Sequence, residues 1–203
     1  MEPARSFERT GPSRFNAVFY GRSRGEMKVT GRVFMALAVV SLASSLSGEE
    51  SLSWYKATAG MAPTIQPGQL MGVDQSAYGM VADVRRGDII VFRFPESPEH
   101  LFAMRVVGLP KEEVSLQGGR VAINQVPLAV SGSGETRTER AGKEKYRIQG
   151  AGTCDKSADE MPSVQVPEGS FFVLGDSRCA SRDSRFWGRL EFSFIVGKVV
   201  KVR

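Results

Sequence analysis

The sequence predicts a mostly β domain. Short runs rich in β-branched and aromatic residues recur along the chain, Gly and Pro turns separate these runs, and helical periodicity is rare. A chain of 203 residues is long enough to bury a core within one compact domain. The chain has no internal repeat and no heptad run.

A basic tail precedes the first apolar segment. Residues 1–32 carry seven Arg and Lys against three Glu, whereas the whole chain has a formal net charge of +5, so the remainder is close to neutral. Nucleic-acid-binding domains usually spread basic residues over a folded face, so this distribution predicts no nucleic-acid partner. It is typical of a tail held on the cytoplasmic side of a membrane, or of a disordered basic tail.

Residues 33–47 form the one long apolar run, and two glutamates follow it. Basic residues before and acidic residues after predict a single-pass segment (33–48) with a cytoplasmic N-terminus and an exported C-terminal domain (49–203). The run rises about 22 Å, less than the ~30 Å of a bilayer core. A cleavable secretory signal has an apolar region of this length, so an anchor and a cleaved signal both remain open. The glutamates of the tail argue against an organelle presequence.

The remaining segments predict β-strands joined by turns. Pro63 and Pro67 disfavour a helix between the first two strands. Gly118 and Gly119 mark the turn of a hairpin over residues 113–124. Further strands are predicted within residues 51–59, 66–74, 85–95, 101–110, 163–176 and 194–202.

Residues 127–162 differ in composition from the rest. Gly, Ser, Thr, Glu and Lys dominate there and apolar residues thin out. We therefore expect a loosely packed insertion with one hairpin near residues 146–149. It lies inside a variable region of about residues 111–162.

The stretch GDSRCASRDSRFWG (residues 175–188) is the most informative motif. It resembles a box of the type I signal peptidases, which are membrane-anchored serine proteases with a lysine general base. The family form is Gly-Asp-Asn-Arg-x-x-Ser-x-Asp-Ser-Arg, then an aromatic and Gly, and Ser177 replaces the Asn. The resemblance implies that Ser181 orients the lysine and that Asp183 and Arg185 form an ion pair beside the site. The other matching residues with polar side chains are Asp176, Arg178 and Ser184.

AGMAPTIQPG (residues 59–68) resembles the nucleophile box of that family, Ser-Met-x-Pro-Thr. Gly60 stands at the serine position, so attack from that position is impossible, and only its N–H survives as an oxyanion donor. Thr58 keeps the hydroxyl that supplies the second donor in the family. The resemblance also places Met61 and Pro63 in the substrate groove.

MRVVGLP (residues 104–110) resembles the lysine box, Lys-Arg-x-x-Gly-x-Pro. Met104 stands at the lysine position, and a thioether fills an apolar pocket but cannot take a proton. Arg105 cannot act in its place, because a guanidinium stays charged at any relevant pH.

The resemblance runs from about residue 56 to residue 203 and implies a fold and a function. The fold is a coiled β-sheet or barrel-like catalytic domain with a small inserted β excursion. The function we expect is that of an inactive homologue, with a groove lined by Thr58, Met61, Pro63 and the chain around Phe92. It would bind signal peptides of exported preproteins, or pair with an active relative. A working peptidase with displaced or partner-supplied groups and a structural subunit of a membrane complex remain alternatives.

Three further expectations concern lipid, cysteines and cofactors. Cys154 and Cys179 lie in the part expected to be exported, where a disulfide is permitted, but the sequence does not say whether they pair. Spaced His and Cys ligands and a phosphate loop are missing, so we expect no metal and no cofactor; the one histidine, His100, lies in a predicted loop. An apolar surface meets the bilayer in the family, and its candidates here are Phe92, Phe94, Pro95, Phe186, Trp187, Phe192 and Phe194.

Overall fold

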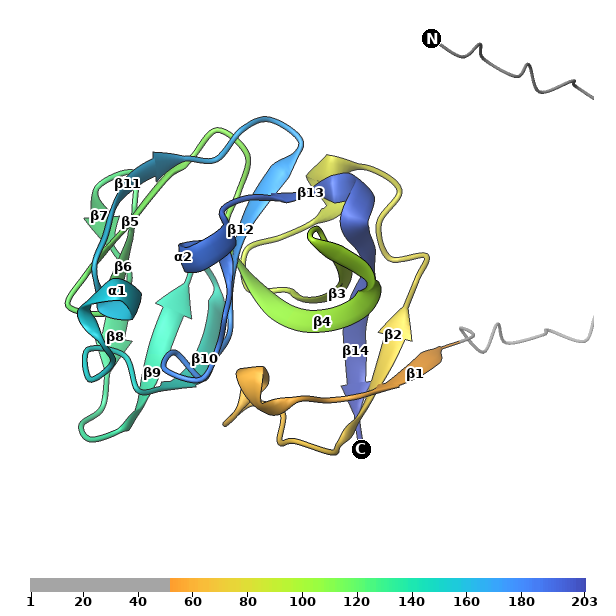
Figure 1. The fold of residues 1–203 in the computed structure, drawn as a ribbon, viewed down its shortest axis with the longest axis horizontal. Coiled ribbons are helices and arrows are strands. Elements are labelled where there is room, and N and C mark those ends of the chain that lie inside the picture. The colour runs from red at the N-terminus through yellow and green to blue at the C-terminus, as the bar shows by residue number, and fades with distance from the viewer. Residues whose placement is uncertain (1–51) are drawn as a thin grey trace, which may run out of the picture. The chain divides into compact units, whose positions relative to one another are not determined.

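The computed structural model describes residues 52–203, and Figure 1 shows their arrangement. The basic tail (1–32) and the expected membrane segment (33–48) lie outside the described residues. Within residues 52–203, none of the helices has the length and apolar character needed to cross a bilayer.

One large antiparallel sheet organises the described chain, which confirms the mostly β prediction. The sheet is open, because its outer strands each pair on one side only, so the barrel alternative is wrong for residues 52–203. One edge strand, Leu190–Glu191, has only two residues, which are too few to pair with the opposite edge and close a ring. In spatial order the strands are β1 (Ser53–Lys56), β2 (Leu70–Asp74), β14 (Ile195–Val202), β3 (Ile89–Phe94), β4 (Ser97–Gly108), β12 (Ser170–Leu174) and β13 (Leu190–Glu191).

Two smaller sheets form the inserted region on the left of Figure 1. The first has the order β11 (Met161–Gln165), β5 (Glu113–Gln117), β6 (Arg120–Ile123) and β7 (Val126–Pro127). The second has the order β10 (Glu144–Gln149), β9 (Thr136–Ala141) and β8 (Ala129–Ser131). Both predicted hairpins are present, as β5–β6 and β9–β10.

The expectation of a loosely packed insertion is wrong. Tyr146 and Ile148 of β10 and Ala141 of β9 are buried together with Ala151 in a small apolar cluster. Glu139 of β9 is also buried there, in an ion pair with Arg178 that is described below.

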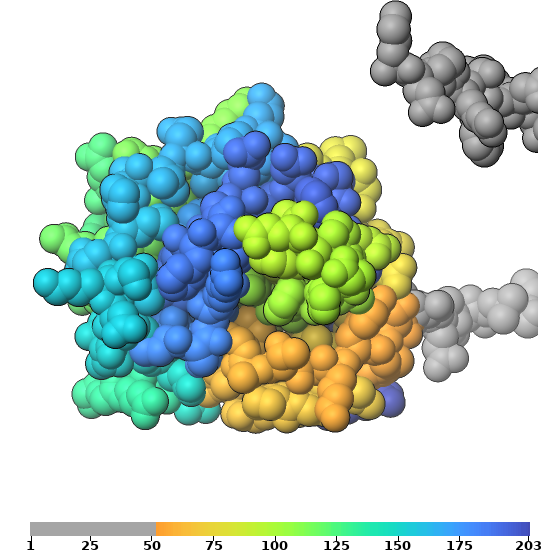
Figure 2. Space-filling view, in the orientation of Figure 1, coloured from red at the N-terminus to blue at the C-terminus, as the bar shows by residue number. Residues whose placement is uncertain are grey.

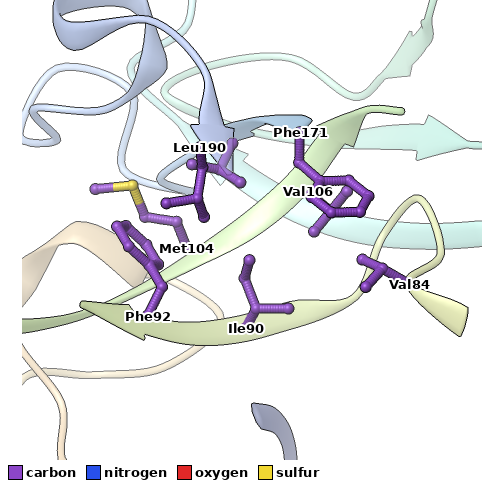
Figure 3. Packing of buried hydrophobic residues seen from close by; sticks show 8 residues of the cluster. Val84, Ile90, Phe92, Met104, Val106, Phe171 and Leu190 are labelled. Atoms are coloured by element: carbon purple, nitrogen blue, oxygen red, sulfur yellow. The ribbon is translucent and has the colours of Figure 1, made fainter. Parts of the chain in front are cut away.

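The main core depends on the alternation of side chains along β3 and β4. Ile90 and Phe92 of β3 face one apolar cluster, and Val91 faces another on the opposite side of the sheet. Met104 and Val106 of β4 join the first cluster (Figure 3). Each of these five side chains is at most 5% exposed.

Helices are few and short, and local chemistry fixes their ends. α2 begins after Asp183, whose carboxylate accepts a hydrogen bond from the backbone N–H of Arg185. It ends at Gly188, whose φ of 86° suits glycine. The short helices are η1 (Ala59–Met61), η2 (Val81–Asp83), α1 (Lys156–Asp159), α2 (Ser184–Trp187) and η3 (Phe192–Phe194).

The loop predicted around His100 is a strand instead. β4 begins at Ser97, directly after a turn at Pro95 and Glu96, and His100 is exposed on it with Nδ1 3.2 Å from Glu99. The two prolines beside the turn misled the prediction, because an edge or hairpin strand tolerates proline.

Candidate active site

The η1 turn carries Gly60 against the GDSR segment. The N–H of Ser177 donates to the carbonyl of Gly60 over 3.1 Å, which fixes the turn on that segment. A Cβ built on Gly60 would lie 3.8 Å from Ser181 Oγ, an ordinary van der Waals distance. Gly60 is also absent from the positive-φ residues. A serine would therefore fit at position 60 without strain.

Ser181 beside Gly60 is buried and unsatisfied. Ser181 is 6% exposed, and its Oγ has no hydrogen-bond partner within the described chain. A buried hydroxyl without a partner typically costs about 1–3 kcal/mol. A polar group next to this hydroxyl would therefore gain a hydrogen-bond partner.

Met104 fills the expected general-base position with apolar contacts. It is 5% exposed and belongs to the cluster that contains Phe92 and Leu190 (Figure 3). An amine placed there would be poorly solvated, and burial would lower its pKa. This is the kind of environment that a lysine base needs.

A cavity of about 110 Å³ lies beside η1, between β1 and the β3–β4 hairpin. Figure 2 shows a depression between the orange segment and the yellow-green hairpin. Thr58 and Met61 line this cavity. Phe92 lies on the other face of β3 and is fully buried, so Val91 takes its place in the cavity wall. Pro63 follows η1 but is not among the lining residues.

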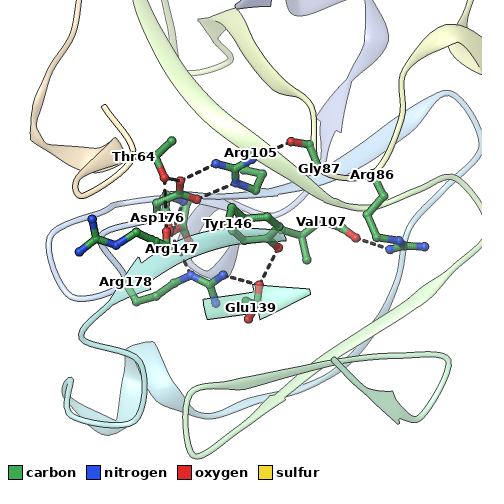
Figure 4. Close-up of polar contacts among 12 residues, drawn as sticks. Thr64, Arg86, Gly87, Arg105, Val107, Glu139, Tyr146, Arg147, Asp176 and Arg178 are labelled. Carbon is green, nitrogen blue, oxygen red and sulfur yellow. Dashed lines mark hydrogen bonds and ion pairs between the residues drawn. The ribbon is translucent and has the colours of Figure 1, made fainter. Parts of the chain in front are cut away.

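Asp176 connects the three boxes (Figure 4). Its carboxylate accepts two hydrogen bonds from Arg105, from Nε at 2.8 Å and from Nη2 at 2.6 Å. The hydroxyl of Thr64 donates to the same carboxylate. Arg105 also donates to the carbonyl of Gly87 over 2.7 Å. Because Asp176 and Arg105 are both almost fully buried, removing one would leave the other charge unpaired.

Asp183 and Arg185 form the ion pair that the resemblance implied. Arg185 Nε and Nη2 lie 2.7 and 2.8 Å from the two carboxylate oxygens of Asp183. Asp183 also accepts a hydrogen bond from the N–H of Gly175, and Ser184 Oγ accepts one from the N–H of Val173. These contacts hold the segment that carries Ser181 against β12.

Sequence reasoning missed two residues of the insertion that support the site. Glu139 accepts hydrogen bonds of 2.7 Å from Arg178 and from the hydroxyl of Tyr146. The ring of Tyr146 lies under the guanidinium of Arg105, 3.9 Å from its carbon (Figure 4). Glu139 lies in a polar stretch, TRTERA, which resembles an exposed strand. The one available signal is that Arg178, if buried, needs an acidic partner.

The electrostatics of this group follow from its burial. Burial raises the pKa of the Tyr146 hydroxyl well above its ordinary value, and the neighbouring Glu139 charge raises it further. Burial is the largest single influence and lowers the pKa of the Arg178 guanidinium, but Glu139, Tyr146 and Asp176 together outweigh it, so the net shift is upward. Tyr146 is thus held neutral and Arg178 charged.

Cys154 and Cys179 are joined in a disulfide. The bond connects the loop after β10 to the segment that carries Ser181. The N–H of Arg178 donates to the carbonyl of Gln149, so backbone and disulfide fix the same two segments together.

The candidate bilayer-facing aromatics differ in how much of their surface is exposed. Phe94 and Trp187 pack edge to face with ring centroids 5.9 Å apart, and Phe192 and Phe194 pack partly buried against the main core. Phe92 belongs to the core itself. Phe186 is 46% exposed and is the member that presents most surface to solvent.

Comparison with known proteins identifies the family. The model of the family described as "Signal peptidase, peptidase S26" matches residues 27–202, which include all three boxes. The chain belongs to this signal peptidase family. The match extends upstream of the resemblance expected from residue 56.

Individual signal peptidases align over the same region. Signal peptidase I of Bacillus caldolyticus is 34% identical over 140 residues, covering 68% of this chain and 71% of that protein. Signal peptidase I of Leptolyngbya laminosa is 35% identical over 153 residues, covering 72% and 65%. That of Pseudomonas fluorescens is 33% identical over 150 residues, and the alignment spans only 52% of its length. A solved signal peptidase I from Enterococcus faecalis is 29% identical, covering 58% of this chain and 97% of that one, with a TM-score of 0.39.

Proposed function

We propose that this chain is a catalytically inactive signal peptidase homologue that binds signal peptides of exported preproteins without cleaving them. Gly60 offers no nucleophile, and Met104 offers no proton acceptor. A serine–lysine protease needs both, because the base must remove the hydroxyl proton as the serine attacks.

The unpaired hydroxyl of Ser181 is the observation that carries the proposal. Ser181 is buried beside Gly60, and its Oγ has no partner among the described residues. An active site of this family would give that hydroxyl the lysine amine to bind. With a thioether in the lysine position, the hydroxyl remains without a partner.

The cavity beside η1 supports retained peptide binding. Residues of β1 and β4 line it together with Thr58 and Met61, and most of its wall is apolar. A volume of about 110 Å³ accommodates a small side chain. The backbone N–H of Gly60 and the hydroxyl of Thr58 lie at the end of the same segment and would meet the peptide carbonyl.

Restoring both groups tests whether only the reacting side chains are missing. The full chain in detergent should not cleave a standard preprotein, whereas the Gly60→Ser/Met104→Lys variant should. Each single variant should stay at background, because nucleophile and base act as one unit. Burial of the introduced lysine should lower its pKa, so cleavage should rise with pH and reach its plateau below about pH 10.

Binding is measured separately with a fluorescent signal peptide. Ala103→Phe fills the cavity and should weaken binding by about tenfold or more, whereas Ala82→Phe, an exposed site on η2, should not change it. Cleavage by the unmodified chain would overturn the inactive assignment in favour of displaced or partner-supplied groups. A double variant that neither binds nor cleaves would favour a structural subunit of a membrane complex.

The remaining parts of the proposal concern location and partners. Residues 1–32 are proposed to be cytoplasmic, residues 33–48 to be a single membrane-spanning segment, and residues 49–203 to lie on the exported side. Lipid and an active signal peptidase are the proposed partners. Cysteine accessibility labelling from each side of intact membranes checks the topology.

A further inference from the structure

A second and larger cavity lies in the insertion, away from the η1 turn. Its volume is about 670 Å³, within the range of about 300–1,000 Å³ that is usual for small-molecule sites. We propose that this cavity binds a small polyhydroxylated anion, such as a sugar phosphate or sugar carboxylate, whose anionic group pairs with Arg120 and Arg137. Its lining residues differ from those of the cavity beside η1, so the proposal stands independently of the proposed function.

Two guanidinium groups without acidic partners give the cavity its charge. Arg120 on β6 is exposed, and no ion pair or side-chain hydrogen bond joins it to the described residues. Arg137 on β9 donates from Nη2 to the carbonyl of Ala151, and its Nε is buried without a partner. Its Nη1 is neither hydrogen-bonded nor among the buried unpaired atoms, which leaves it accessible to a ligand.

The one acidic residue in the wall is already engaged. Glu160 accepts a hydrogen bond of 2.8 Å from the N–H of Gly118 and makes no ion pair with either arginine. The cavity therefore keeps a net positive lining, which favours an oxyanion. Arginine suits phosphate and carboxylate, because its planar fork matches their geometry.

The rest of the wall fits a hydroxyl-rich body. Gln117, Gln125 and Ser115 line the cavity, and their side chains make no hydrogen bond among residues 52–203, so they are free to bind hydroxyl groups. Ala122, Pro127 and Val130 provide a short apolar floor. A sugar ring presents hydroxyls at its edge and apolar C–H groups on its face, and this lining matches both.

The wall is preorganised by tight backbone packing. Gly119 has a φ of 71°, and a Cβ on it would lie 2.1 Å from the backbone nitrogen of Gly152. Asp159 accepts hydrogen bonds from the N–H groups of Gly152 and Cys154. The turn and the disulfide loop thus hold the cavity edge in one position, which reduces the entropy cost of binding.

Isothermal titration of the full chain in detergent at low salt tests the proposal. Glucose 6-phosphate and glucuronate should bind, glucose should not, and inorganic phosphate should bind more weakly than glucose 6-phosphate. The ratio between the first two probes tells which anionic group is preferred. Failure of both anionic sugars to bind, or equal binding of glucose, would overturn the proposal, and equal binding of inorganic phosphate would overturn its sugar part.

Charge-neutral variants assign the binding to the cavity. Arg120→Gln and Arg137→Gln should each weaken binding by about tenfold, since a charge-assisted hydrogen bond is lost. Arg140→Gln is the matched control, because Arg140 is exposed on β9 but does not line the cavity. Arg137 also donates a hydrogen bond to the carbonyl of Ala151, so Arg137→Gln could unfold the protein. In that case the variant of the exposed Arg120 provides the test. Undiminished binding by Arg120→Gln would contradict the proposal.

Discussion

At the scale of single residues, buried ion pairs connect segments of the chain that are far apart in the sequence. Glu139 and Arg178 are separated by 39 positions and are 0% and 1% exposed. Tyr146 connects this pair to Arg105, which in turn holds Asp176. Removing one member of a buried pair usually costs about 3–5 kcal/mol, because the partner charge stays buried. The group therefore acts as a structural unit beneath the candidate site.

Tyr146 makes this unit sensitive to high pH. Burial first, and Glu139 second, raise its folded-state pKa above the unfolded value of about 10. The folded state therefore keeps a proton that the unfolded state has released, so the stability from neutral Tyr146 is complete below about pH 10 and declines above it. The free energy of unfolding, measured by urea titration from pH 8 to pH 11, should fall less steeply in Tyr146→Phe.

A second tyrosine contributes to the same decline. Tyr78 has a pKa that is raised by burial and by Asp88, so it should keep part of the decline in the Tyr146→Phe variant. An unchanged slope in Tyr146→Phe would show that this hydroxyl does not resist ionisation.

At the scale of elements, the β5–β6 hairpin shows how backbone packing limits a turn. Gly118 and Gly119 both have positive φ, of 56° and 71°. A Cβ on Gly118 would meet nothing within 4 Å, whereas one on Gly119 would collide with Gly152 and Asp159. Both positions thus require a positive φ, but only position 118 has room for a side chain.

This contrast gives a matched pair of substitutions. Gly118→Ala should cost about 1 kcal/mol, the penalty of a left-handed conformation for an L-residue. Gly119→Ala should cost at least about twice as much, because the turn must also move away from the disulfide loop. Thermal unfolding of both variants measures the difference, and equal losses would mean that the turn does not pack on Gly152.

At the scale of the whole described chain, the insertion and the main sheet are joined at several points. The disulfide between Cys154 and Cys179, the Glu139–Arg178 pair and the contact of Tyr146 with Arg105 all cross from one to the other. Arg185 also donates to the carbonyl of Ala158 over 2.7 Å. The insertion is therefore a support for the segment that carries Ser181.

The disulfide should contribute measurably to this connection. It closes a loop between residues 25 positions apart, which destabilises the unfolded chain by about 3.5 kcal/mol in the entropic model. Cys154→Ser/Cys179→Ser should lower the free energy of unfolding by about that amount, and reduction of the native chain should reproduce the loss. A native chain that is indifferent to reduction would mean that the two thiols do not pair.

The sequence determined the fold class, most strands and the family. The strand IIVFRF is an almost continuous run of β-branched and aromatic residues, and the GDSR box is contiguous, so both can be recognised without any long-range contact. That Gly60 and Met104 stand where the resemblance expects a serine and a lysine can be read from the same contiguous motifs. These features are local, and local chemistry decides them.

Only the tertiary structure decided which distant residues meet. The pairing of Cys154 with Cys179, the role of Glu139 and Tyr146, and the position of Val91 rather than Phe92 in the cavity wall all depend on contacts across the chain. Residues 127–162 look polar and loose in the sequence, although Glu139 is buried in an ion pair with Arg178 and an apolar cluster forms around Tyr146 and Ile148. The sequence records a buried charged residue and an exposed one in the same way, and only the three-dimensional surroundings distinguish the two.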